Sequence, residues 1–205
     1  MITDYHTLNL QSMDLLLCSG ESDLSNKIKW FQRLTGWPVP DNELSHLACC
    51  YKTTKTGLSV IESTTLNKWC NKSGVQMNPF DDWLNNYNGR VWVKQLTFDR
   101  KPYNKQILNY WLEHRNDPYE NGIMGGLELF LCGLGLHKII QKVIPSYKPL
   151  QTKNPHCTEL IAELFKELSF FNRGVETNRM PPALWWEEIN SWFNIGYAYK
   201  NIRIK

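Results

Sequence analysis

Three residues that lie far apart in the chain have side chains that could together carry out acyl transfer. They are Cys157, His46 and Glu62. A cysteine thiolate is a nucleophile, an imidazole beside it can accept its proton, and a carboxylate can orient that imidazole. Such a set attacks a carbonyl carbon and holds the acyl group as a thioester. Each residue also has an ordinary structural explanation, so the elements that carry the three residues must decide.

Cys157 lies near the start of a predicted helix, residues 154–168. Apolar residues recur at helical spacing along one face, namely Cys157, Leu160, Ile161, Leu164, Phe165 and Leu168. Asn154 is the expected N-cap and Pro155 suits the first helical position, so Cys157 would be about the third helical residue. Unpaired N–H groups and the helix dipole favour a thiolate there. The alternative is a buried cysteine that packs as a small apolar residue.

His46 lies in one predicted strand, residues 44–51, and Glu62 lies in the next, residues 58–63. Turn-forming residues around Thr54 separate the two strands, so we expect a hairpin. If the hairpin is symmetric about Thr54, His46 faces Glu62 with the Cβ atoms about 5 Å apart. A slip of one residue would break this pairing. The alternatives are a hydrogen-bonded structural histidine and a solvated glutamate near a strand end.

The elements that must position these residues divide the chain into two halves. Residues 12–97 are predicted to be mainly strands, and residues 101–193 mainly helices. Besides the hairpin, the expected strands are 12–18, 74–77, 90–96 and 197–204. The expected helices are 22–34, 79–87, 103–115, 127–143, 154–168 and 183–193. Strands followed by helices in a chain of 205 residues predict a single α+β domain, residues 1–205, with a small antiparallel sheet.

Charge and cysteine content exclude several classes of protein. The net charge is +3 and the basic residues are scattered, so nucleic acid is not expected as a partner. The six cysteines include no CxxC pair, so we expect neither a metal site nor another cofactor. Most of the cysteines stand in apolar runs, which suits a reducing compartment.

Targeting signals are also missing from the sequence. The first residues have neither a basic nor an apolar region, so no signal peptide is expected. The longest apolar run, residues 123–136, is too short and too interrupted by glycines for a membrane span. The expected location is therefore the cytoplasm, or a virion or the medium after lysis if a phage encodes the protein.

Four segments in this order resemble the motifs of a known family. They are Asp14-Leu15-Leu16-Leu17, Ser45-His46-Leu47-Ala48, Val60-Ile61-Glu62-Ser63 and Cys157-Thr158-Glu159-Leu160-Ile161. The order resembles that of the circularly permuted NlpC-like, papain-like cysteine peptidases of the YiiX type, to which the lecithin:retinol acyltransferase group is distantly related. The resemblance covers roughly residues 12–190 and implies a sheet or half-barrel packed against helices. It also implies His46 as base, Glu62 as its orienter and Cys157 as nucleophile.

The chain departs from the family pattern at a few positions, none of which removes a catalytic group. Met13 stands where the family has glycine, Leu47 and Ala48 replace a Val-Gly pair, and His156 replaces an aromatic residue before the cysteine. Because His156 is adjacent to Cys157 on a helix, the two side chains point in different directions. His156 is therefore expected to touch substrate or to be exposed, and not to act as the base.

Two further residues, with His156, are candidates for binding substrate. Tyr119 follows a proline and resembles a Pro-Tyr-Asp element that precedes the cysteine helix in the family. Trp37 stands among prolines just before the histidine strand and could form the wall of a cleft. The glycine-rich apolar stretch 122–136 is either an ordinary core helix, a mobile lid or a surface that touches lipid.

The resemblance implies hydrolysis of an amide bond, with a cell-wall peptide as the first expected substrate. The first alternative is a lipid acyl hydrolase or acyltransferase, which would associate with a membrane surface. The second alternative is a structural or partner-binding module without activity, for example in a virion. The presence of Cys157, His46 and Glu62 together favours an enzyme over such a module.

Overall fold

The computed structural model describes residues 2–34, 43–55, 57–67, 70–97, 99, 101–119, 156–171, 182–186 and 197–205. Six antiparallel strands form one sheet in the order β4-β3-β2-β1-β5-β6. The strands are β1 (Leu15–Gly20), β2 (His46–Thr53), β3 (Gly57–Asn67), β4 (Lys72–Pro79), β5 (Gly89–Leu96) and β6 (Tyr197–Arg203). The last strand brings the end of the chain back to the sheet beside β5.

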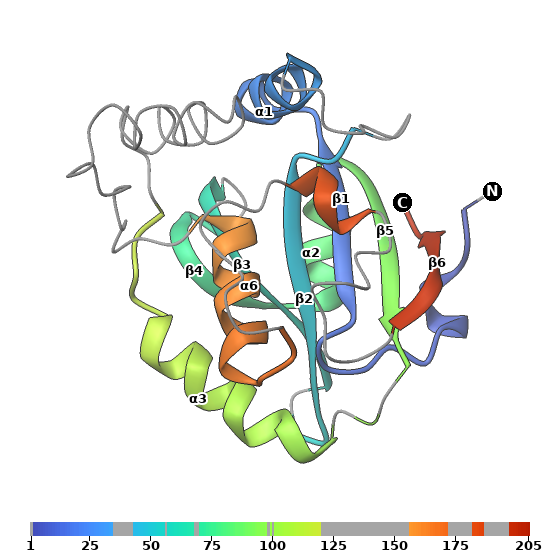
Figure 1. The fold of residues 1–205 in the computed structure, drawn as a ribbon, viewed down its shortest axis with the longest axis vertical. Coiled ribbons are helices and arrows are strands. Elements are labelled where there is room, and N and C mark those ends of the chain that lie inside the picture. Colours follow the sequence, from blue (N-terminus) through green and yellow to red (C-terminus); the bar gives the residue numbers. More distant parts are fainter. Residues whose placement is uncertain are drawn as a thin grey trace.

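Helices cover both faces of this sheet. They are α1 (Asp23–Leu34), α2 (Phe80–Asn86), α3 (Asn104–His114) and α6 (Cys157–Glu167), with short 3-10 turns at Tyr5–Thr7, Lys101–Tyr103 and Pro182–Trp185. Figure 1 shows α6 in front of the sheet and α2 behind it. Helix α6 lies against β2 and β3, the two strands that carry the predicted base and acid.

Alternation along the strands divides the buried side chains between two cores. Leu15 and Leu17 of β1 belong to one core, and Leu16 and Cys18 belong to the other, because successive side chains point to opposite faces of a strand. Helices α3 and α6 close the first core, and α2 closes the second through Trp83. Burial of one leucine contributes about 1.5–3 kcal/mol, so both cores hold the helices firmly on the sheet.

The predicted α+β class and small antiparallel sheet are confirmed. Among the described strands, β4 and β6 are the edges, so the sheet is open. The predicted helix 127–143 lies outside the described residues, as does most of 183–193, of which only residues 183–186 are described, within the turn Pro182–Trp185 and the residue after it. That the chain is a single domain stays a prediction.

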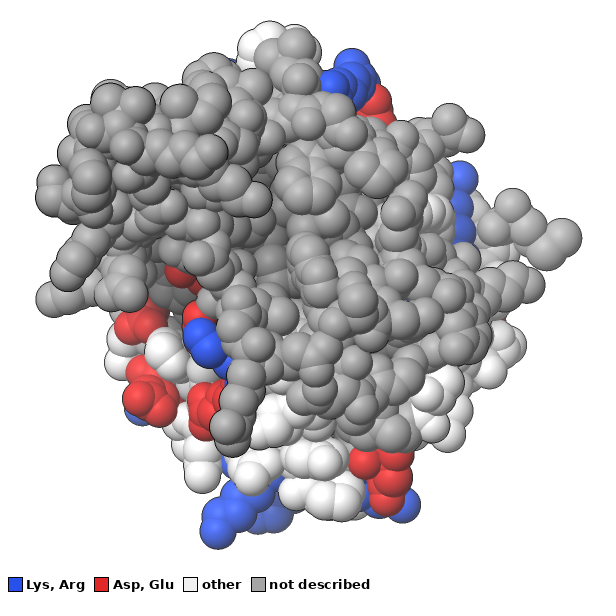
Figure 2. Space-filling model, in the orientation of Figure 1, with Lys and Arg blue, Asp and Glu red and all other residues white. Residues whose placement is uncertain are grey.

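The described surface has two further features that bear on partners. No helix in the described ranges combines the length and the apolar character that crossing a membrane requires. On the face drawn in Figure 2, the visible Lys and Arg side chains are separated from one another and interspersed with Asp and Glu. The basic residues visible there therefore do not form one continuous patch.

Candidate active site

The hairpin that carries His46 and Glu62 is present, but the predicted register is wrong by two residues. The observed pairs are Cys49 with Ile61, Cys50 with Val60, Tyr51 with Ser59, Lys52 with Leu58 and Thr53 with Gly57. Continued by one residue, this register sets Glu62 opposite Ala48, so His46 is its diagonal neighbour. Because the displacement is even, both side chains stay on one face. The centre of the turn lies at residue 55 and not at residue 54, because Thr53 pairs with Gly57, whose φ of 70° is in the left-handed region that favours glycine.

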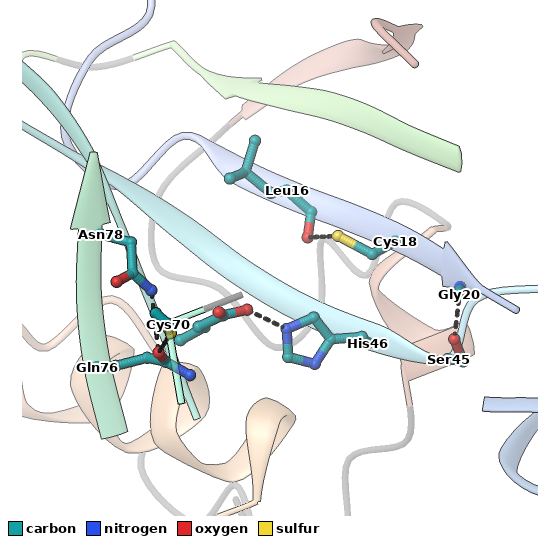
Figure 3. A network of polar contacts seen from close by, with 9 residues as sticks. Leu16, Cys18, Gly20, Ser45, His46, Cys70, Gln76 and Asn78 are labelled. Carbon is teal, nitrogen blue, oxygen red and sulfur yellow. Dashed lines mark hydrogen bonds and ion pairs between the residues drawn. The ribbon is translucent and has the colours of Figure 1, made fainter. Parts of the chain in front are cut away.

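Beyond the pair of Cys49 with Ile61, β2 and β3 no longer pair with each other. Each then pairs only with the strand on its other side. His46 of β2 pairs with Cys18 of β1, and Glu62 of β3 pairs with Gln76 of β4. At this point Nε2 of His46 and Oε2 of Glu62 lie 2.8 Å apart. Figure 3 draws this contact as the dashed line from the His46 ring. The side chains are 12% and 2% exposed, respectively. The predicted contact between base and acid is therefore made by diagonal neighbours at the point where two strands separate.

Cys157 is the first residue of α6. The sequence had predicted the third helical position. The N-cap is His156, whose Nδ1 accepts a hydrogen bond from the N–H of Glu159 at 3.1 Å; Asn154 lies outside the described residues. The N–H of Cys157 therefore has no intrahelical partner and points out of the helix start. The Cys157 side chain is 5% exposed, and the helix dipole favours negative charge on it.

The electrostatics of His46 depend on both of its partners. Burial lowers the pKa of the imidazole, but the Cys157 sulfur and the Glu62 carboxylate raise it through charge and hydrogen bonds, from 6.5 to about 10. The imidazolium is therefore stable at neutral pH. Its contribution to folding stability is fully present below pH 6.5 and is lost as the pH rises through about 10.

Tyr87 and Cys18 also line this site, and neither was predicted. Tyr87 follows α2 as its C-cap, and its ring lies parallel to the His46 ring at a centroid distance of 6.4 Å. Its hydroxyl shares a hydrogen bond with the Cys18 thiol, and burial together with the Cys18 and Glu62 charges raises the Tyr87 pKa well above its usual range. Tyr87 is therefore a neutral hydroxyl. In the sequence, the only indication of this position was that Tyr87 follows Trp83 by four residues, a helical spacing.

The predicted substrate-binding residues have different outcomes. Tyr119 lies near the nucleophile, because burial and the charge of Cys157 raise the pKa of its hydroxyl well above the usual range. His156 caps α6, and a contact with substrate stays a prediction. Trp37 and the stretch 122–136 lie outside the described residues.

A backbone contact between β4 and the segment after α3 brings Tyr119 to the site. The N–H of Val75 donates to the carbonyl oxygen of Asp117 at 3.0 Å. Gly74 permits this close approach, because a Cβ built there would lie 2.3 Å from the same oxygen. Tyr119 is two residues beyond Asp117, so this contact holds the segment that carries Tyr119 beside β4.

Replacing Gly74 by alanine is expected to destabilise the protein by about 3 kcal/mol, from strain at φ 94° and the clash with Asp117. Gly57→Ala is a matched control, since φ is 70° there but no atom lies within 4 Å of the added Cβ. The control should lose only about 1 kcal/mol. Urea unfolding followed by circular dichroism compares the two. Equal losses would mean that the approach of Asp117 does not require glycine.

The part of the chain that the structure describes contains no candidate metal-binding site. No group of three or more His, Cys, Asp or Glu side chains is placed there to hold an ion. Cys157, His46 and Glu62 follow one another in pairwise contacts, with the histidine in the middle. That the protein uses no metal or cofactor stays a prediction.

Comparisons with known proteins give little further guidance. No protein-family model matches this chain, and no curated protein matches it. Among solved structures, the chain is similar to the crystal structure of the metalloprotein YiiX from Escherichia coli O157:H7, with 12% identical residues and a TM-score of 0.47. The alignment covers 94% of this chain and 88% of that one. A likeness of this size establishes neither kinship nor activity.

Proposed function

We propose that this protein is a thiol hydrolase that transfers an acyl group first to Cys157 and then to water. One observation carries the proposal: the His46 ring contacts Glu62 through Nε2 at 2.8 Å and also lies within hydrogen-bonding reach of the Cys157 sulfur. Because Glu62 occupies Nε2, Nδ1 is the nitrogen left for the thiol. A nucleophile, a base and an orienting acid in this sequence of contacts are the minimum for covalent acyl transfer.

Acylation begins from the thiolate and imidazolium. The Cys157 sulfur attacks the carbonyl carbon, and the π electrons move to the carbonyl oxygen, which the free N–H of Cys157 can hold. The tetrahedral intermediate then collapses. The bond from carbon to the leaving nitrogen breaks, and His46 gives that nitrogen its proton. The products are a thioester on Cys157, a free amine and a neutral imidazole.

Deacylation uses the same residues in the opposite sense. Neutral His46 takes a proton from water, and the resulting hydroxide attacks the thioester carbon. The carbon–sulfur bond breaks and the thiolate leaves, with the imidazolium beside it. Glu62 keeps the ring oriented and stabilises its positive charge during both proton transfers. The carboxylic acid is released and the starting state is restored.

The substrate class is proposed from the family resemblance. An amide bond in a cell-wall peptide is the first substrate to examine, and an acyl ester or amide of a lipid is the second. Both present a carbonyl to the same thiolate, and they differ in the leaving group that His46 must protonate. A partner-binding module without turnover is the remaining alternative.

The proposal predicts an acyl group on Cys157 during turnover. Purified protein is mixed with wall peptides and lipid esters, quenched in acid and examined by intact mass and peptide mapping. The expected adduct lies on Cys157 and is removed by hydroxylamine, as a thioester is. Cys70→Ser is the matched control, because Cys70 is a partly exposed cysteine outside the three-residue set. Folded protein that forms neither adduct nor product with any amide or ester would support the non-enzymatic module.

A further inference from the structure

Gln76 of β4 is buried beside the site with half of its side-chain amide unused. The residue is 4% exposed, and its Nε2 has no hydrogen-bond partner among the described residues. Buried polar groups in native proteins are almost always paired, so an unpaired donor calls for a functional explanation.

The orientation of this amide is fixed by its other end. Oε1 of Gln76 accepts hydrogen bonds from Nδ2 of Asn78 at 3.0 Å and from the Cys70 sulfur at 3.4 Å. A flipped amide would set its NH₂ group against the NH₂ group of Asn78. Nε2 must therefore point the other way, and Figure 3 shows it on the side where the His46 ring lies.

The sheet places that free donor next to the predicted acid. Gln76 and Glu62 are directly opposed on β4 and β3, and His46 of β2 contacts Glu62 from the far side. Side chains directly opposite on antiparallel strands have Cβ atoms about 5 Å apart. Three polar residues thus follow one another across three neighbouring strands, with the carboxylate in the middle.

We propose that Gln76 is a positioning residue that acts through Glu62: its Nε2 donates to the carboxylate whenever His46 is neutral. This inference rests on the proposed function. In the resting state the imidazolium compensates the buried carboxylate. When His46 has given its proton to the leaving group, Glu62 retains a full charge beside a neutral ring, which is costly in a buried site. A small shift of the Glu62 carboxylate toward β4 then lets Gln76 share that charge.

The titratable groups around Glu62 come from four elements. His46 of β2 makes the direct contact, while Cys18 of β1 and Tyr87 at the end of α2 interact with the Glu62 charge. Cys157 of α6 is linked to it through His46. Tyr87 and Cys18 both have pKa values raised well above their usual ranges. They stay neutral through the pH range in which His46 loses its proton, so that transition reports the imidazole.

The test is the pH titration of the His46 imidazole, followed by nuclear magnetic resonance across about pH 10, where its raised pKa lies. Gln76→Met removes the donor at nearly constant volume. Without that donor the neutral ring beside the charged carboxylate is less stable, so the His46 titration should move up by about one pH unit. Met77→Leu on the same strand is the control and should leave the titration in place.

Asn78→Leu gives a second measurement if Gln76→Met does not fold. It removes the donor that orients the amide, so a smaller upward shift is expected. A merely structural role for Gln76 would lower stability without moving the titration, and an unmoved titration in folded Gln76→Met overturns the inference. Failure of the proposed function would give a different result. Cys157 of the wild-type protein would then show no preferential alkylation at any pH.

Discussion

Cys157→Ala is expected to abolish turnover while the protein stays folded. Removing the nucleophile of a comparable catalytic set lowers kcat by about 10⁶-fold, because no other group can form the acyl intermediate. The structural effect is small, since alanine suits the first turn of a helix and only the sulfur is lost from a side chain that is 5% exposed. We expect a loss of about 1 kcal/mol in stability.

The other two residues of the set should differ from each other. His46→Ala should reduce turnover almost as much as Cys157→Ala, because nucleophile and base act as a unit. Glu62→Gln keeps the shape of the side chain and part of the contact at Nε2, so its loss should be about 10² smaller. Turnover of the substrate found in the acylation screen, with circular dichroism as the check on folding, measures all three. Wild-type turnover in folded Cys157→Ala would require a different nucleophile.

The parts of the site that rest on local pattern could be predicted from the sequence. The apolar face of α6 follows a helical repeat, and the hairpin is announced by turn residues between two apolar strands. Both patterns extend over only a few neighbouring residues, so they need no knowledge of the rest of the fold. The face shared by His46 and Glu62 was likewise correct, because an even error of register leaves alternation unchanged.

The errors arose where several local solutions were equally good. The turn residues 53–57 allow a hairpin centred on residue 54 or on residue 55, and the observed pairing of Thr53 with Gly57 centres it on residue 55. Asn154 is a better N-cap than His156 by type. The histidine takes that position because its ring nitrogen reaches the N–H of Glu159, a detail of geometry that residue preference does not contain.

Tyr87, Cys18 and Gln76 could not have been found by pattern. Each enters the site through strand order: β1 next to β2, β4 next to β3, and the helix after β4 folded behind the sheet. A glutamine in a strand with no helical or metal-binding spacing carries no signal until its neighbour across the sheet is known. Pairings between distant segments, and not residue types, set these contacts.

Among the described cysteines, Cys157 is expected to react first with limiting iodoacetamide at about pH 6.5, the ordinary pKa of histidine. Burial raises the pKa of the Cys18 thiol well above its usual range, and burial with the Asp14 charge raises that of Cys49 to about 12. Cys70 is more accessible than Cys157. The experiment therefore separates accessibility, which favours Cys70, from an adjacent positive charge, which favours Cys157.

The size and the pH dependence of the effect follow from the ion pair. An ordinary thiol is only about 1% ionised at this pH, so a full thiolate gains up to about 100-fold in rate, reduced by its lower nucleophilicity. We expect at least about a tenfold preference for Cys157 over Cys70. Because the His46 pKa is raised to about 10, the imidazolium persists across neutral pH and the rate there should be nearly flat.

His46→Ala decides whether the imidazolium is the cause. The variant removes the positive partner, so labelling of Cys157 at this pH should slow by about tenfold, whereas labelling of Cys70 in the same sample should not change. Peptide mapping by mass spectrometry reads both sites together, which makes Cys70 an internal control for folding and reagent. If Cys70 were labelled first in the wild-type protein, or if His46→Ala left Cys157 unaffected, Cys157 would be a packing residue of the core and the proposed hydrolase would have no nucleophile.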